Sequence, residues 1–230
     1  MIGLLRRTWR EYEDKGISYV INAGMHVIFN WLFFVLYIKK FKKRRRFKFQ
    51  GRSYSYFFHW HNTTWKNERA VEIPIILKII KEFQGKNILE VGNVLSYYFP
   101  IDHDVLDKYD LADGIIREDV VDFRPNKKYD LIVSISTLEH VGWDENPKDP
   151  RKALGALKNL KALLAPRGKI VITFPLGHNP TLDESLTSGK REFNNLYFFK
   201  QVSEDNEWKE LDSPFPKERS LAIGIIIKGR

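Results

Sequence analysis

The chain contains no cysteine among its 230 residues. Disulfide bonds, thiolate catalysis and zinc sites built from cysteine are therefore excluded. The absence is compatible with a reducing compartment without identifying one. Because 43% of the residues are hydrophobic, the chain is long enough for one α/β domain with a substantial core and a short additional segment.

Acidic residues are missing around the main cluster of positive charge. Residues 39–48 hold eight lysines and arginines and no acid, whereas the formal net charge of the whole chain is +9. Subtracting those eight cations leaves +1 for the rest of the chain. A nearly neutral body argues against an extended nucleic-acid-binding surface, so the basic run must be interpreted from its neighbours.

Charge is also missing from residues 17–38, which are rich in Ile, Val, Phe, Leu and Trp. A span of roughly 20 apolar residues can cross a bilayer core as a helix. The polar residues in this stretch fall four apart and would form one narrow stripe on a helix. They are Ser18, Asn22, His26 and Asn30.

Three interpretations of this N-terminal apolar helix remain open. It could span a membrane, lie in the membrane interface with the basic run on anionic head groups, or pack on the rest of the protein. We expect residues 1–48 to form a membrane-associating segment, in contact with a membrane surface or bilayer through residues 17–48, and residues 49–230 to form the main domain. If the helix spans the membrane, the eight cations after it outnumber the four before it. The positive-inside rule then places the main domain in the cytoplasm.

The basic run also permits a nucleic-acid interpretation. Phe41, Phe47 and Phe49 alternate with the cations, as aromatic side chains do on surfaces that stack nucleic-acid bases. The apolar stretch directly before the run already explains a cluster of charge at a membrane, so nucleic acid is the less favoured partner.

Short apolar runs alternate with helical patterns through the rest of the chain. The runs predict strands over residues 87–91, 105–107, 114–116, 131–136, 169–174 and 221–227. Helices are expected over 153–164 and after Pro74, which suits a first helical turn. Residues 47–65 and 181–217 could either close over a substrate site or complete the packing. Alternating strands and helices predict an α/β fold with a doubly wound, mostly parallel sheet.

Several motifs follow one another in a characteristic order. They are Ile88-Leu89-Glu90-Val91-Gly92, then Asp107, Asp119-Val120, Tyr129-Asp130-Leu131-Ile132 and Leu138-Glu139-His140-Val141. In this order and at this spacing, the sequence resembles the class I S-adenosylmethionine-dependent methyltransferase superfamily over residues 67–228. The resemblance implies a Rossmann-like methyltransferase fold, an enzyme, and S-adenosyl-L-methionine as cofactor.

The resemblance also implies roles for individual residues in cofactor binding. Glu90 would hold the methionine end of the cofactor, and Gly92 would allow its close approach to the backbone. Asp107 would bind the ribose hydroxyls. Asp119 would accept a hydrogen bond from the adenine amino group, and the backbone amide of Val120 would contact the adenine ring. Asp122 is the alternative candidate for the role of Asp119. The resemblance also implies that Asn93 and Ser136 contact the cofactor.

The loop after the first strand departs from the family pattern, because it holds a single glycine. Asn93 tolerates a left-handed conformation better than most residues, so we expect the turn to form there. The bulk of Leu95 would narrow the approach of the cofactor. This loop motivates one alternative function, a non-catalytic membrane-tethered domain with the methyltransferase fold.

Methyl transfer requires mainly that the acceptor be aligned with the cofactor. An acceptor hydroxyl would need a base, and His140 is suited to that role, with Glu139 orienting it; His178 is a second candidate. Each could instead have only a packing role. No metal site is expected from the histidine spacing. We expect a small-molecule, glycan or lipid-linked acceptor, with an RNA-directed methyltransferase as a further alternative.

Overall fold

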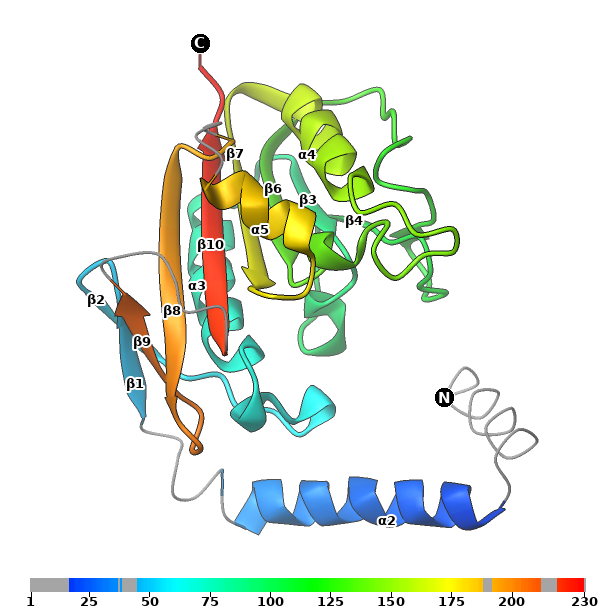
Figure 1. Cartoon of the computed structure of the whole chain (residues 1–230), viewed down its shortest axis with the longest axis vertical. Coiled ribbons are helices and arrows are strands. Elements are labelled where there is room, and N and C mark those ends of the chain that lie inside the picture. Colours follow the sequence, from blue (N-terminus) through cyan, green and yellow to red (C-terminus); the bar gives the residue numbers. More distant parts are fainter. Residues whose placement is uncertain (1–16, 37, 39–44, 188–191, 212–218, 230) are drawn as a thin grey trace.

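The computed structural model describes residues 17–36, 38, 45–187, 192–211 and 219–229. The first sixteen residues and residues 39–44, which include Phe41 and most of the basic run, lie outside the described residues. A central sheet has helix α3 on one face and helices α4 and α5 on the other (Figure 1). These helices cover Arg69–Glu82, Lys152–Leu163 and Pro180–Thr187.

The sheet contains eight strands. Their spatial order is β5 (Ile115–Ile116), β4 (Asp104–Leu106), β3 (Ile88–Val91), β6 (Tyr129–Ile135), β7 (Leu164–Pro175), β10 (Ser220–Ile227), β8 (Asn195–Ser203) and β9 (Glu207–Leu211). The first five are parallel, β10 runs antiparallel to both β7 and β8, and β9 closes the edge antiparallel to β8. The predicted mostly parallel, doubly wound α/β sheet is confirmed.

The middle strand β6 shows why this sheet is buried on both faces. Leu131 and Val133 pack with α3, whereas Ile132 packs with α4, and none of the three is exposed. A parallel sheet covered by helices on both sides needs such a continuous apolar run. Helix α3 begins at Arg69, so Pro74 lies inside the helix and not in its first turn as expected.

A two-stranded hairpin precedes the sheet. Strand β1 (Arg46–Phe49) pairs with β2 (Arg52–Ser55). Phe47 and Phe49 are buried to 4% and 3% exposure and pack their rings against Phe199 on β8. Their burial leaves neither ring free to stack on a nucleic-acid base. The domain boundary expected after residue 48 falls within β1.

The segments of undecided role both contribute to packing. Tyr56, after the hairpin, accepts a hydrogen bond of 2.8 Å from the backbone N–H of Trp208 on β9. The stretch expected over 181–217 supplies most of α5 and the whole of β8 and β9, which finish the sheet. These residues therefore extend the core.

Helix α2 (Ile17–Phe33) lies beyond one end of the sheet (Figure 1). The described residues that follow it, 34–36 and 38, continue in π-helical conformation, within the helix expected over residues 17–38. Just after α2, the ring of Phe34 packs on Trp65, with 5.3 Å between the ring centroids. Within the described part of the chain, no helix combines the length and apolarity needed to cross a membrane.

Replacing Phe49 with Ala tests whether the hairpin belongs to the core. We expect the free energy of unfolding to fall by about 3–5 kcal/mol, because a buried ring and its contacts are lost. Chemical denaturation monitored by circular dichroism measures the change. Phe29→Ala is the matched control, since this ring is 64% exposed and its loss should change stability by less than about 0.5 kcal/mol. Equal effects of the two substitutions would contradict the assignment.

Candidate active site

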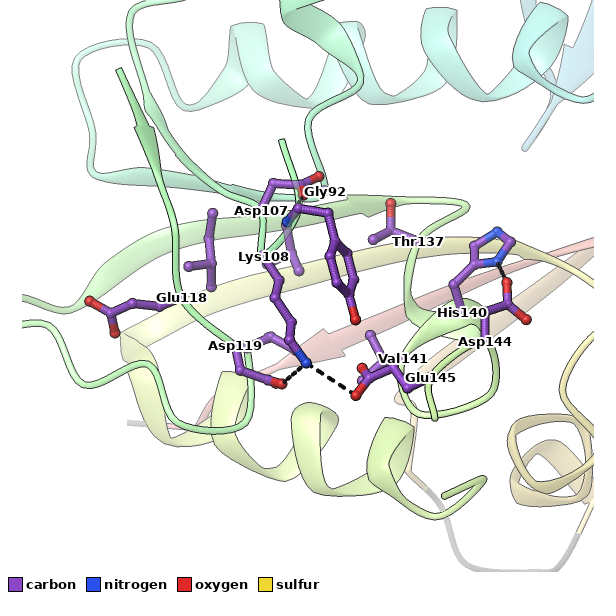
Figure 2. Close-up of a pocket in the computed structure, with 14 residues that line it drawn as sticks. Gly92, Asp107, Lys108, Glu118, Asp119, Thr137, His140, Val141, Asp144 and Glu145 are labelled. Atoms are coloured by element: carbon purple, nitrogen blue, oxygen red, sulfur yellow. Dashed lines mark hydrogen bonds and ion pairs between the residues drawn. The ribbon is translucent and has the colours of Figure 1, made fainter. Parts of the chain in front are cut away.

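A cavity of about 260 Å³ lies where β3, β4 and β6 end (Figure 2). Open parallel sheets bind their ligands at this edge, and the volume is close to the lower end of ligand pockets, roughly 300 Å³. Apolar and charged side chains from the strand ends and the loops after them line the cavity. They include Val91, Leu106, Asp107, Lys108, Asp119, Val120, Thr137, His140, Val141, Asp144 and Glu145.

The loop after β3 turns at Gly92, which has φ +84°. A Cβ atom at this position would lie 2.1 Å from Thr137 Oγ1, so no larger residue fits without displacement. Asn93 does not adopt the left-handed conformation expected of it. Leu95 is 1% exposed and packs in the core on the α3 side, away from the cavity. The single glycine is therefore sufficient for the turn, and Leu95 does not narrow the cavity.

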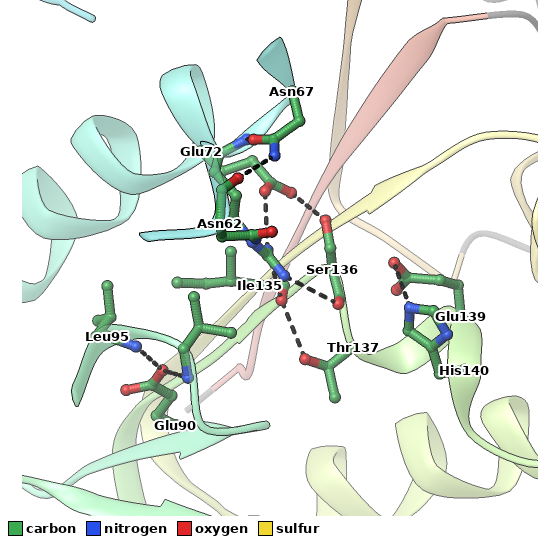
Figure 3. A network of polar contacts seen from close by, with 12 residues as sticks. Asn62, Asn67, Glu72, Glu90, Leu95, Ile135, Ser136, Thr137, Glu139 and His140 are labelled. Atoms are coloured by element: carbon green, nitrogen blue, oxygen red, sulfur yellow. Dashed lines mark hydrogen bonds and ion pairs between the residues drawn. The ribbon is translucent and has the colours of Figure 1, made fainter. Parts of the chain in front are cut away.

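The buried side chain of Glu90 holds the backbone of this loop in place. Its Oε1 accepts hydrogen bonds from the backbone N–H groups of Val94 (2.9 Å) and Leu95 (2.8 Å) (Figure 3). Its Oε2 lies 2.9 Å from His103 Nε2. The carboxylate is fully buried and does not line the cavity. Its observed partners belong to the loop, and the methionine-binding role implied by the resemblance stays a prediction.

Asp107 lines the cavity at the end of β4. One carboxylate oxygen accepts a hydrogen bond from the backbone N–H of Asn93 (2.9 Å). The other accepts hydrogen bonds from the backbone N–H groups of Tyr109 (2.8 Å) and Asp110 (2.9 Å). A carboxylate offers about four acceptor positions, so capacity remains for a ligand hydroxyl. These bonds also join the β3 and β4 loops into one wall.

Asp119 lies in a network of opposite charges on the far side of the cavity. Its Oδ2 is 2.6 Å from Lys152 Nζ and 2.9 Å from Lys108 Nζ. Burial raises the pKa of this carboxyl, but the hydrogen bonds from the two lysines outweigh that effect and lower it to about 2. Lys108 also reaches Glu145 (3.1 Å) across the cavity (Figure 2). Val120 lines the same wall, whereas the rival Asp122 is exposed and does not.

Two histidines meet at one end of the cavity. His140 Nδ1 is 2.5 Å from Asp144 Oδ2, and His178 Nε2 is 3.4 Å from Asp144 Oδ1. Glu139, the expected orienting residue, is fully buried, with Oε1 3.7 Å from His140 Nε2. Burial raises the pKa of the Glu139 carboxyl well above its usual range. The hydrogen-bond partner of His140 is therefore Asp144, four residues later.

Ser136 contacts helix α3, and the cofactor-binding role that the resemblance implies for it stays a prediction. It has φ +37° and donates its hydroxyl to Glu72 Oε1 (2.5 Å) on α3 (Figure 3). Arg69 bonds to Glu72 (3.0 Å) and to the backbone oxygen of Ile135 (2.9 Å). This network fixes the end of β6 to α3, and Thr137 is the residue of this turn that reaches the cavity.

Sequence reasoning missed Lys108, Thr137 and Glu145 as cavity residues. Lys108 directly follows the strand-end acid Asp107, which is the one local signal that could have drawn attention to it. Thr137 and Glu145 carry no such signal, because their positions depend on turns that only the folded chain defines.

No protein-family model matches the chain, and no curated protein matches its sequence. Among solved structures, the N-methyltransferase NodS from Bradyrhizobium japonicum WM9, in complex with S-adenosyl-L-homocysteine, is similar with a TM-score of 0.50 and 14% identity. The match covers 71% of this chain and 89% of that chain. This chain has a methyltransferase fold.

Other methyltransferases superimpose less well. A TehB-like protein from Corynebacterium glutamicum has a TM-score of 0.42 at 21% identity, covering 66% of this chain and 86% of its own. A methyltransferase from Archaeoglobus fulgidus has a TM-score of 0.44 at 17% identity, covering 67% of this chain and 91% of its own.

The charge network predicts an acid-sensitive contribution from Asp119. Because its folded pKa is depressed, this contribution is present above the ordinary pKa near 3.8 and is lost as the pH falls toward 2. Carboxyl ¹³C NMR should show Asp119 titrating near pH 2, and Lys152→Met should raise that pKa. Lys161→Met is the control and should leave the pKa of Asp119 unchanged, because Lys161 pairs with Glu192. Titration of wild-type Asp119 at its ordinary pKa would contradict the network.

Proposed function

We propose that this protein transfers a methyl group from S-adenosyl-L-methionine to a small-molecule, glycan or lipid-linked acceptor. The observation that carries the proposal is the cavity at the ends of β3, β4 and β6, which has Asp107 on one wall and Asp119 on another. It occurs in a fold similar to that of NodS, which was crystallised with S-adenosyl-L-homocysteine.

The cavity residues suit the adenosine part of the cofactor. Val91, Leu106 and Val120 provide apolar walls for a flat ring. Asp107 can accept from a ribose hydroxyl, and Asp119 can accept from the adenine amino group once Lys108 turns aside. Lys108 is 38% exposed, so its ion pairs are weak and rearrange at small cost.

The acceptor end of the cavity is formed by His140 and Asp144, with His178 beside them. When bound, the cofactor supplies an electrophilic methyl group on its sulfonium. The protein must align the acceptor atom with that methyl group, and alignment alone accelerates such reactions strongly. We propose that His140 and His178 position the acceptor and hold it in line.

Calorimetry with S-adenosyl-L-methionine tests the cofactor site. Wild-type protein should bind one equivalent, and Asp107→Asn should weaken binding by about tenfold or more, because a hydrogen bond to a charged acceptor is lost. Asp122→Asn is the control and should leave the affinity unchanged, since Asp122 is exposed outside the cavity. A folded wild-type protein that binds no cofactor would refute the methyltransferase proposal and leave the non-catalytic alternative.

A transfer assay identifies the acceptor class. Full-length protein and methyl-labelled cofactor are incubated with soluble and membrane fractions of a lysate, with His140→Ala as the inactive comparison. Label in an organic extract indicates a lipid-linked acceptor, and label in the aqueous phase a small molecule or glycan. Label that ribonuclease releases would support the RNA-directed alternative and contradict the proposed acceptor.

We also propose that α2 and the basic run attach the protein to the cytoplasmic surface of an anionic membrane. More than half of the exposed large apolar side chains in the described residues fall within residues 25–36. Ile28, Phe29 and Leu36 are 60%, 64% and 67% exposed. An apolar helix face followed by a dense cationic run suits insertion at a charged lipid interface. Such attachment favours a lipid-linked acceptor.

Vesicle flotation tests the attachment. Binding should be strong for vesicles containing phosphatidylserine and weak for phosphatidylcholine alone, because each lysine or arginine near an anionic surface contributes about 1 kcal/mol. Replacing both Phe29 and Leu36 with Ser should reduce binding. The control replaces Leu111 and Val202, which are 76% and 43% exposed elsewhere, with Ser. Equal binding to both kinds of vesicle, or equal loss in the control, would contradict this proposal.

A further inference from the structure

The three side chains at the acceptor end of the cavity converge on one point. The ligand atoms of His140, Asp144 and His178 all lie within 4.8 Å of one another. The two imidazole rings meet edge to face, with 4.4 Å between centroids. We propose that these three residues form a binding site for a divalent transition-metal ion.

The donor set determines the class of metal. Two imidazole nitrogens and one carboxylate oxygen suit ions such as Zn²⁺, Fe²⁺, Co²⁺ and Ni²⁺, whereas Mg²⁺ and Ca²⁺ prefer sites made of oxygen ligands alone. Three protein ligands leave coordination positions open, the arrangement found where a metal also binds water or substrate.

One of the donor atoms lacks a partner in the protein. His178 Nε2 is buried and makes no hydrogen bond, although Asp144 Oδ1 is only 3.4 Å away. A buried nitrogen left unpaired is unfavourable. A metal ion between His178 and Asp144 would provide the missing interaction.

The second nitrogen of His140 points to the same conclusion. Its Nδ1 faces Asp144, so its Nε2 faces Glu139 Oε1 at 3.7 Å. Both Glu139 oxygens are buried without a hydrogen-bond partner. Histidines that bind metals commonly donate their other ring N–H to a carboxylate or carbonyl. Glu139 is placed to accept that N–H after a small movement, as a positioning residue that does not itself bind the ion.

The loops that carry the two histidines are joined to each other. Asn179, next to His178, donates its side-chain amide to the backbone oxygen of Glu139 at 3.2 Å. Its side-chain oxygen accepts from the N–H groups of Thr181 and Leu182 at the start of α5. One buried side chain therefore fixes the β7 loop against the turn that holds His140, which keeps the ligand atoms together.

The distances are compatible with an ion after modest side-chain rotation. Ligand atoms about 2.1 Å from a metal lie roughly 3–3.5 Å from each other. The distance of 3.4 Å between His178 and Asp144 falls within that range, and the distance of 2.5 Å between His140 and Asp144 is shorter. His140 and Asp144 are about half exposed and can adjust.

His140 and Asp144 line the cavity, so an ion held by them would lie at its edge. An oxygen atom of the acceptor could occupy one of the ion's open coordination positions. This role rests on the proposed methyltransferase function, whereas metal binding itself does not.

Titration of the chelator-treated full-length protein with Co²⁺, followed by visible absorption, tests the site. We expect one equivalent to bind with micromolar affinity, and Zn²⁺ to displace it. Asp144→Asn and His178→Gln should each weaken binding at least tenfold. His61→Gln is the control, because His61 stacks on Tyr97 away from the cluster. The Co²⁺ affinity of this variant should equal that of the wild-type protein.

Thermal unfolding confirms that each variant is folded before its affinity is compared. Absence of Co²⁺ binding by folded wild-type protein, or equal affinity in Asp144→Asn and wild type, would overturn the metal site. Glu139→Gln should weaken binding less than Asp144→Asn does, because it alters only the partner of His140. Calorimetry with S-adenosyl-L-methionine on the metal-free protein reports separately on the methyltransferase proposal.

Discussion

The buried carboxylate of Glu90 is the interaction on which the cavity depends. By accepting the N–H groups of Val94 and Leu95, it folds the chain after β3 back into the protein and directs Leu95 into the core. Without those bonds, two buried donors would be left unpaired, at a cost of about 1–3 kcal/mol each. The same turn brings the Asn93 N–H to Asp107 and so closes one wall of the cavity. A loop with one glycine therefore forms the same kind of open strand end that glycine-rich loops provide.

The opposite wall is held by charge. Lys108 and Lys152 neutralise Asp119 and Glu145, so four ionised groups can stand around a small cavity without mutual repulsion. Lys108 is the most exposed of the four and is the one able to leave when a ligand enters. The cavity thus combines one rigid wall, made by backbone hydrogen bonds, with one wall that can exchange its ion pairs for contacts to a ligand.

The sequence predicted the parallel strands well, because each contains an apolar run, and burial on both faces demands such runs. It did not predict the β1–β2 hairpin, because Phe47 and Phe49 alternate with cations and gain their burial from Phe199, about 150 residues later. The His140–Asp144 pair follows a four-residue spacing that can be read locally. His178 joins it only through the Asn179 bond between two loops, which no local pattern reveals.

Ring contacts and hydrogen bonds connect the N-terminal segment to the loop after β3. Phe34, just past α2, packs on His59 (6.4 Å between centroids), which packs on Tyr98 (5.2 Å). Beside Tyr98, Tyr97 bonds through its hydroxyl to Asp110 (2.7 Å), and Asp110 in turn accepts from the Asn93 side chain (2.8 Å). The proposed membrane-binding segment and the proposed cofactor loop therefore share one packed layer. Attachment of α2 to a lipid surface would fix the orientation of the cavity relative to that surface, which is the arrangement that an acceptor held in the membrane requires.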